Sequence, residues 1–205
     1  MSHILLITSS PRGAASYSSK VARSLADKLA SGAPGSTITV RDLHANPLPH
    51  IADEFAAARA AAGAGATLSP AQKATLAVSD KLLEEFFAAD ILVIGSGMIN
   101  FGIPSTLKTY IDYILRPGAT FRYTAKGPEG LAKGKKAYLV SARGGVYSEG
   151  PMQPFNFQDT YLRAALGFMG ITDIETITVE GVAFGPEVAE KSYAAAIAKV
   201  ATLAA

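Results

Sequence analysis

Hydroxyl-bearing side chains gather in a polar segment that follows an apolar run near the N-terminus. Residues 4–7 are all apolar, and residues 8–18 after them include Ser10, Ser16 and Ser18, with Arg12 between them. Each hydroxyl can donate a hydrogen bond, and a guanidinium can donate a charge-assisted one. At the start of a helix, such groups suit a phosphate because free amides and the helix dipole both favour an anion. The segment predicts a phosphate site; the alternative is a polar loop with an ordinary serine helix cap.

A second segment, residues 95–104, combines glycine with apolar side chains and one amide. Glycines let the backbone approach a planar ligand, and apolar side chains can cover the faces of its ring. Asn100 can donate and accept at the edge of a heteroaromatic ring. The alternative is a packed loop held by a buried apolar residue. The candidate ring contacts are Met98, Ile99, Asn100 and Phe101.

A third segment, residues 141–147, contains the pair Gly144 and Gly145, whose amides can face the oxygens of a ring system. Arg143 either braces this site or is a solvated charge. Neither GxxxxGK[ST] nor a GxGxxG fingerprint after the first strand is present, which argues against the two commonest phosphate loops. A phosphate end, a planar ring and polar ring-edge contacts together predict a mononucleotide such as FMN.

These segments would meet at one edge of a sheet if the apolar runs are parallel strands. Apolar runs at 4–7, 38–40, 91–94, 137–140 and 174–179 alternate with helical patterns at 17–32, 70–87, 104–114, 155–168 and from 186 onward. This alternation predicts an α/β fold with a parallel sheet covered on both faces, in one domain over residues 1–205. Residues 43–68 resemble an insertion with a short helix around 54–61, and residues 120–124 alternate like one arm of a hairpin.

Composition excludes several classes of function. The chain has no cysteine, so thiol chemistry, iron–sulfur clusters and disulfides are excluded, and with three histidines no metal site is expected. A net charge of +2, evenly spread, does not indicate nucleic acid binding. No apolar stretch is long enough to span a membrane, and no signal peptide is evident, so we expect a cytoplasmic protein without a membrane partner.

Several segments, in order along the chain, resemble the FMN-dependent NADH:quinone oxidoreductase and azoreductase family. The segments that carry the resemblance are residues 40–43 (VRDL), 98–101 (MINF), 121–124 (FRYT), 127–131 (GPEGL), 133–137 (KGKKA), 143–145 (RGG), 166–171 (LGFMGI) and 180–181 (EG). The resemblance implies a flavodoxin-like, doubly wound five-stranded parallel sheet of order 2-1-3-4-5. It also implies non-covalent FMN and a homodimer with the flavin near the subunit interface.

The family pattern also implies site residues, matched position by position. The phosphate side would include Ser10, Ser16, Tyr17 and Ser18; the ring segment would be Met98, Ile99, Asn100 and Phe101; the polar ring edge would be Ala142, Arg143, Gly144 and Gly145. Arg59, Tyr123, Tyr147 and Phe168 would belong to the substrate pocket. Three positions depart from the pattern, because many members have Tyr at 99 and Ser at 142, and some have His at 147. These departures bear on substrate range more than on FMN binding.

The resemblance implies a two-electron ping-pong reaction. NADH passes a hydride to the flavin, and a quinone or an azo compound then accepts it, so no side-chain nucleophile or general base is required. Two alternatives remain at this point: a flavodoxin-type electron carrier, and a nucleotide-binding protein without catalytic activity.

Overall fold

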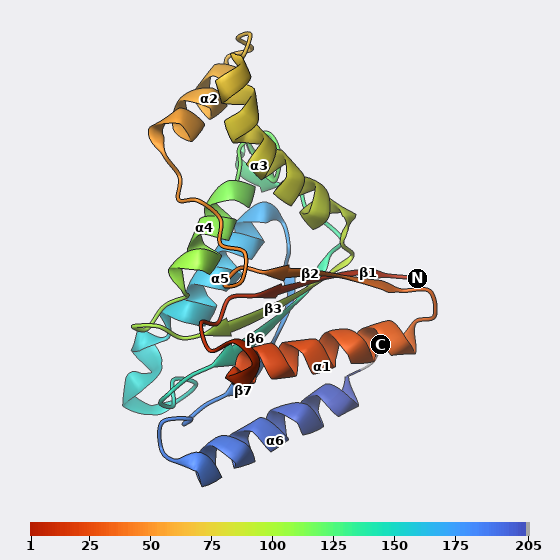
Figure 1. The fold of residues 1–205 in the computed structure, drawn as a ribbon, viewed down its shortest axis with the longest axis vertical. Helices are drawn as coiled ribbons and strands as arrows, with labels where there is room; N and C mark the ends of the chain where they lie inside the picture. The colour runs from red at the N-terminus through yellow and green to blue at the C-terminus, as the bar shows by residue number, and fades with distance from the viewer. Residues whose placement is uncertain (204–205) are drawn as a thin grey trace.

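The computed structural model describes residues 1–203, which are built around a five-stranded parallel sheet (Figure 1). Its strands are β1 (His3–Thr8), β2 (Thr37–Asp42), β3 (Ile91–Gly97), β6 (Lys136–Ala142) and β7 (Asp173–Val179). They lie in the order β2-β1-β3-β6-β7. In chain order β6 and β7 are the fourth and fifth strands of this sheet, so the arrangement corresponds to the expected 2-1-3-4-5. The predicted domain reaches residue 205, and its last two residues lie outside the described part.

Helices cover both faces of the sheet, because side chains alternate along each strand. Leu5 and Ile7 face an apolar cluster with α3 (Pro70–Ala88), α4 (Ser105–Ile114) and α5 (Phe157–Met169). Ile4 and Leu6 face a second cluster with α1 (Tyr17–Gly32) and α6 (Pro186–Thr202). Figure 1 shows α1 and α6 on one side of the sheet and α4 and α5 on the other. The predicted two-faced packing is confirmed.

Helix starts follow local sequence signals closely. Ser16 caps α1 by accepting a hydrogen bond from the amide of Ser19, and a short 3-10 helix, η1 (Gly13–Ala15), precedes it. Ser69 and Gln72 form a capping box at the start of α3, whose first residue, Pro70, is where the helical pattern over 70–87 begins. The helix predicted over 155–168 begins later, at Phe157, because residues 150–155 form the 3-10 helix η2 (Gly150–Phe155) and Asn156 then caps α5.

Two segments extend beyond the layers of sheet and helices: one contains a helix between β2 and β3, and the other is a hairpin between α4 and β6. The segment predicted to hold a short helix contains α2 (Asp53–Gly63), which packs against α3, and Figure 1 shows both reaching away from the sheet. The predicted hairpin is formed by β4 (Phe121–Thr124) and β5 (Gly127–Gly130). Gly130 lies against Gly170 at the end of α5, where an added Cβ at position 130 would be 2.2 Å from the Gly170 nitrogen. Only two glycines permit this approach.

In the part of the chain that the structure describes, no helix combines the length and the apolar character needed to cross a membrane.

Candidate functional site

A cavity of about 340 Å³ opens at the carboxyl ends of β1, β3 and β6. This is the edge of a parallel sheet at which ligands of α/β proteins bind. One part of its lining carries hydroxyl groups and the other part is apolar. The lining residues are Ser10, Pro11, Arg12, Ser16, Tyr17, Ser18, Gly97, Met98, Ile99, Ala142, Gly144, Val182 and Ala183.

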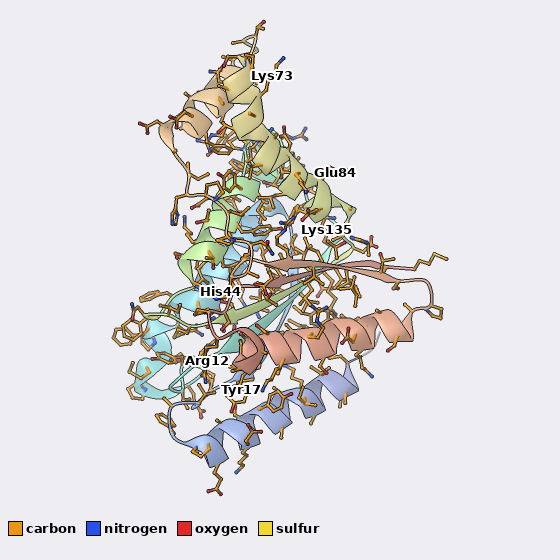
Figure 2. All side chains as sticks on the ribbon, in the orientation of Figure 1. Arg12, Tyr17, His44, Lys73, Glu84 and Lys135 are labelled. Atoms are coloured by element: carbon orange, nitrogen blue, oxygen red, sulfur yellow. The ribbon has the colours of Figure 1, made fainter. Side chains whose placement is uncertain are left out.

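The polar part of the cavity is built on the first turn of α1. Ser10, Ser16 and Ser18 are all buried, and the Ser16 and Ser18 hydroxyl oxygens lie 3.1 Å apart. The Ser19 amide donates to the Ser16 hydroxyl, but the amides of Tyr17 and Ser18 have no acceptor within the described residues and are available to an anion. Figure 2 shows Arg12 and Tyr17 at this same end of α1. The loop before α1 and the first turn of α1 therefore offer hydroxyls, amides and a guanidinium together.

Close packing against β3 holds that first turn in place. A Cβ added at Gly95 would lie 2.9 Å from the Cβ of Ala22 and 3.1 Å from the carbonyl oxygen of Ser18. On the outer side, the Tyr17 hydroxyl donates to Glu190 at 3.0 Å, which raises the pKa of Tyr17. The Tyr17 ring also packs against Tyr193, with their centroids 5.5 Å apart.

The apolar part of the cavity is bounded by a tight turn after β3. Ile99 and Gly102 exchange both backbone hydrogen bonds, and the two residues between them adopt the left-handed conformation, with φ of 46° at Asn100 and 72° at Phe101. Two consecutive non-glycine residues with positive φ are uncommon and are typical of functional sites. The turn exposes the Phe101 ring, which packs against Tyr147 and Phe155.

The loop after β6 completes the cavity through its backbone. The Ala142 carbonyl accepts from the Met98 amide at 2.8 Å, and the Gly144 carbonyl accepts from the Ala183 amide at 3.0 Å. Within the described residues, the amides of Gly144 and Gly145 donate to no acceptor. They remain available to oxygens of a ligand.

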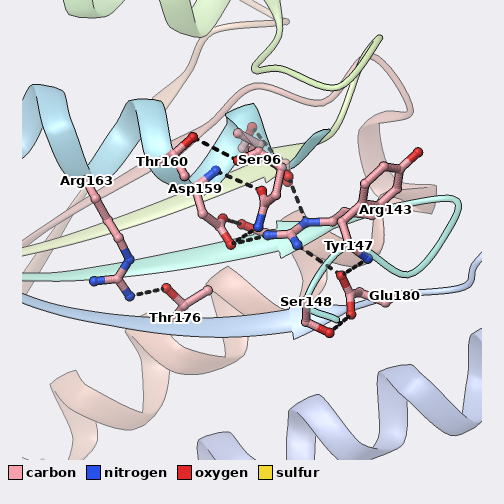
Figure 3. A network of polar contacts seen from close by, with 12 residues as sticks. Ser96, Arg143, Tyr147, Ser148, Asp159, Thr160, Arg163, Thr176 and Glu180 are labelled. Atoms are coloured by element: carbon pink, nitrogen blue, oxygen red, sulfur yellow. Dashed lines mark hydrogen bonds and ion pairs between the residues drawn. The ribbon is translucent and has the colours of Figure 1, made fainter. Parts of the chain in front are cut away.

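The side chain of Arg143 turns away from solvent. It is 1% exposed, and it forms ion pairs with Asp159 and Glu180 (Figure 3). The interpretation of Arg143 as a solvated charge was therefore wrong, because two carboxylates compensate its burial. Burial opposes ionisation of Asp159, but the hydrogen bond and charge of Arg143, with the Ser141 hydroxyl, hold the pKa of Asp159 below its usual value.

Eight of the twelve predicted cofactor residues line the cavity: Ser10, Ser16, Tyr17, Ser18, Met98, Ile99, Ala142 and Gly144. Asn100 and Phe101 form the adjoining turn, Arg143 lies behind the loop, and Gly145 lines a neighbouring cavity with Tyr147. The sequence reasoning missed Val182 and Ala183, which line the cavity from the loop after β7. The parallel sheet was the available signal, since the fifth strand must end at the same edge as the others.

The predicted substrate residues divide into two groups. Tyr147 lies beside Phe101, next to the cavity. Arg59 is on α2 and lines other cavities, together with Arg116 and with Phe55. Tyr123 and Phe168 both pack against Phe121, on the β4–β5 hairpin and the end of α5. None of these last three lines the cavity at the sheet edge.

Across residues 1–203, no group of three or more histidine or carboxylate side chains is arranged to hold a metal ion.

Comparison with known proteins agrees with this geometry. A family model described as a flavodoxin-like fold matches residues 2–204. The chain is 53% identical to an FMN-dependent NADH:quinone oxidoreductase 1 of Rhizobium etli, with 100% of this chain and 98% of that protein covered. It belongs to the FMN-dependent NADH:quinone oxidoreductase family.

Relatives of known structure share the same fold. An azoreductase from Bacillus anthracis is 36% identical, with a TM-score of 0.92, and the match covers 100% of this chain and 99% of that one. An FMN-dependent NADH-azoreductase from Bacillus anthracis, solved in complex with FMN, is 28% identical with a TM-score of 0.88, and both chains are covered completely. The resemblance inferred from the sequence, and membership of the FMN-dependent NADH:quinone oxidoreductase family, are confirmed.

Proposed function

We propose that this protein is an FMN-dependent oxidoreductase that takes electrons from NADH and reduces quinones, and azo compounds in the same way. The observation that carries the proposal is the 53% identity to a quinone oxidoreductase over the whole chain. The cavity at the sheet edge supports it independently, because its lining suits the chemistry of FMN.

Whether FMN fits the cavity can be judged from the hydrogen-bond donors that line it and from its volume. The buried hydroxyls of Ser10, Ser16 and Ser18 and the first amides of α1 suit a phosphate dianion. Met98, Ile99 and Val182 offer apolar surface to a flat ring. Gly97 and Gly144 line the cavity with backbone alone. A cavity of about 340 Å³ lies in the range of cofactor sites.

FMN, when bound, supplies the centre that accepts a hydride from one substrate and gives it to the next. The chain's own residues would bind the cofactor, orient it and tune its reactivity. The loop before α1 and its first turn would hold the phosphate, and the Ile99–Gly102 turn would form one wall of the ring site. The Gly144 and Gly145 amides, which have no acceptor within the described residues, would be available to stabilise negative charge added to the ring. Tyr147 and Phe101 give a flat substrate an aromatic border.

The positions of Arg59, Tyr123 and Phe168 support a homodimer. Tyr123 is 74% exposed, and all three residues lie apart from the cavity of their own chain. If these are substrate residues, as the family resemblance implies, the residues of one subunit would border the cavity of the other. We therefore propose a homodimer whose substrate pockets contain groups from both subunits.

The decisive experiment is NADH oxidation by the FMN-loaded protein with a benzoquinone acceptor. Rapid turnover without another protein is expected, and slow reduction that needs a protein acceptor would favour an electron carrier. Native mass spectrometry of the purified protein should show FMN; another nucleotide without turnover would favour a non-catalytic binding protein.

The dimer is tested separately, by light scattering and by Tyr123→Ala. We expect twice the chain mass, and a raised KM for the quinone with FMN affinity unchanged. A monomer with full activity would contradict the shared pocket.

A further inference from the structure

Four polar side chains form a group behind the loop after β6, and we call Arg143, Gln158, Asp159 and Glu180 the Arg143 cluster. Arg143 and Gln158 are buried, and the Asp159 and Glu180 side chains are 15% and 13% exposed. Figure 3 shows Arg143 between Asp159 and Glu180. The guanidinium uses all three of its nitrogens. Nη2 pairs with Asp159, Nη1 donates to Glu180 at 2.9 Å, and Nε donates to the Gln158 side-chain oxygen at 3.1 Å. The Arg143 side chain is thus held on three sides.

The Arg143 cluster connects the ends of three strands. The Gln158 amide donates to the carbonyl oxygen of Ser96, near the end of β3, at 3.0 Å. Asp159 accepts from the Ser141 hydroxyl, on β6, at 2.7 Å. Glu180 directly follows β7.

A side chain of the Arg143 cluster holds the far end of the loop after β6, and backbone hydrogen bonds hold its near end. Glu180 accepts from the Tyr147 amide at 2.8 Å, so it fixes the far end of residues 143–147. The Arg143 amide and carbonyl pair with Val179 and Val182, which hold the near end. Between these two points lie Gly144 and Gly145, whose amides have no acceptor within the described residues.

Stability alone is a weak reason for such an arrangement. The cost of removing ions from water largely offsets their attraction, so buried ion pairs often add little net stability. The Arg143 cluster also carries one guanidinium against two carboxylates, which leaves one excess negative charge close to the cavity edge. Both carboxylates are mostly shielded from solvent, so water screens this charge less than it would screen a fully exposed one.

We propose that the Arg143 cluster is a positioning unit for the cofactor. It holds the Gly144 and Gly145 amides toward the flavin ring, and its excess negative charge weakens the binding of reduced flavin relative to oxidised flavin. This inference rests on the proposed function, because it concerns FMN bound in the cavity at the sheet edge.

The positioning role is tested with Gln158→Leu, which removes the link to β3 without removing a charge. We expect the Kd for oxidised FMN to rise at least tenfold, and amide hydrogen exchange across residues 142–147 of the flavin-free protein to speed up. The matched control is Arg163→Ala. Arg163 also lies on α5 and donates to β7, through Ile174 and Thr176, but away from the cavity. It should leave both measurements unchanged.

The charge is tested with Glu180→Gln, which keeps an oxygen able to accept from the Tyr147 amide. Reduced flavin should gain about tenfold in affinity relative to oxidised flavin, which raises the two-electron midpoint potential by about 30 mV. A thermal melt of each variant separates this effect from a general loss of fold. Arg41→Ala, which breaks the ion pair between β2 and α3, serves as a stability control.

The outcomes separate the two proposals. If the wild-type protein binds FMN and turns over quinone, but Gln158→Leu and Glu180→Gln match Arg163→Ala in affinity, exchange and potential, the positioning role is wrong and the proposed function stands. If the wild-type protein binds no FMN, both fall. A variant that lowers the melting temperature without changing affinity or potential also overturns the positioning role.

Discussion

Gly95→Ala should weaken FMN binding although position 95 does not line the cavity. Gly95 lies on β3 beneath the first turn of α1, where an added Cβ would be 2.9 Å from the Ala22 Cβ and 3.1 Å from the Ser18 carbonyl oxygen. Ordinary carbon contacts are about 3.5–4.0 Å, so β3 and α1 must separate by several tenths of an ångström. The Ser18 oxygen belongs to backbone, so a rotamer change cannot relieve the contact.

Two magnitudes follow from this geometry. Overpacking of this kind costs about 1–3 kcal/mol of folding free energy, which for a chain of 205 residues lowers Tm by about 2–4 °C per kcal/mol. The shift also displaces Ser16 and Ser18 from the phosphate. Loss of one hydrogen bond to a charged group costs about 1.5–3 kcal/mol, so the Kd for FMN should rise about tenfold or more.

The assay pairs fluorescence titration of FMN with a thermal melt. Gly167→Ala is the control, because Gly167 is a helical residue in the last turn of α5 with no atom within 4 Å of an added Cβ. That variant should gain about 0.4–1 kcal/mol and bind FMN normally. Unchanged FMN affinity in a destabilised Gly95→Ala would refute the role of the first turn of α1, and an unchanged Tm would refute the close contact.

Three further predictions concern stability. Tyr110→Phe should raise the free energy of unfolding by about 1 kcal/mol in urea titrations, because the buried Tyr110 hydroxyl has no hydrogen-bond partner among the described residues; a loss would mean that a water satisfies it. The depressed pKa of Asp159 adds stability above the ordinary carboxyl pKa of about 3.9, and this stability is lost as pH falls below that value. Asp159→Asn should therefore flatten the dependence of the denaturation midpoint on pH between about 5 and 3, and an unchanged slope would contradict the pairing. Ser69→Ala should cost about 1 kcal/mol by removing the α3 cap, and no loss in a urea titration would show that the cap adds nothing measurable.

Regular local patterns made most of the fold predictable. The apolar runs became the strands of the sheet because buried parallel strands need continuous hydrophobic sequence. The start of α3 can be recognised in the sequence because the capping residues Ser69 and Gln72 lie only three positions apart. The hydroxyl-bearing segment before α1 can be recognised as well, since its serines lie where the strand pattern ends and the helical pattern begins.

Features that depend on distant residues were not predictable. Arg143 looked like any loop arginine, because its partners Asp159 and Glu180 are 16 and 37 positions away. Val182 and Ala183 carry no chemical signal of their own and reach the cavity only because β7 ends beside β6. The positive φ of Phe101 runs against the preference of its residue type, so only the folded turn reveals it.

The contact between Gly130 and Gly170 limits how this chain can evolve. Each position excludes a side chain because of the other's backbone, so an enlargement at one cannot be offset by a reduction at its neighbour, since no residue is smaller than glycine. A pair of compensating substitutions therefore cannot occur at these two positions. Variation in the β4–β5 hairpin must therefore arise at its tip and its outer faces, while the attachment to α5 stays the same.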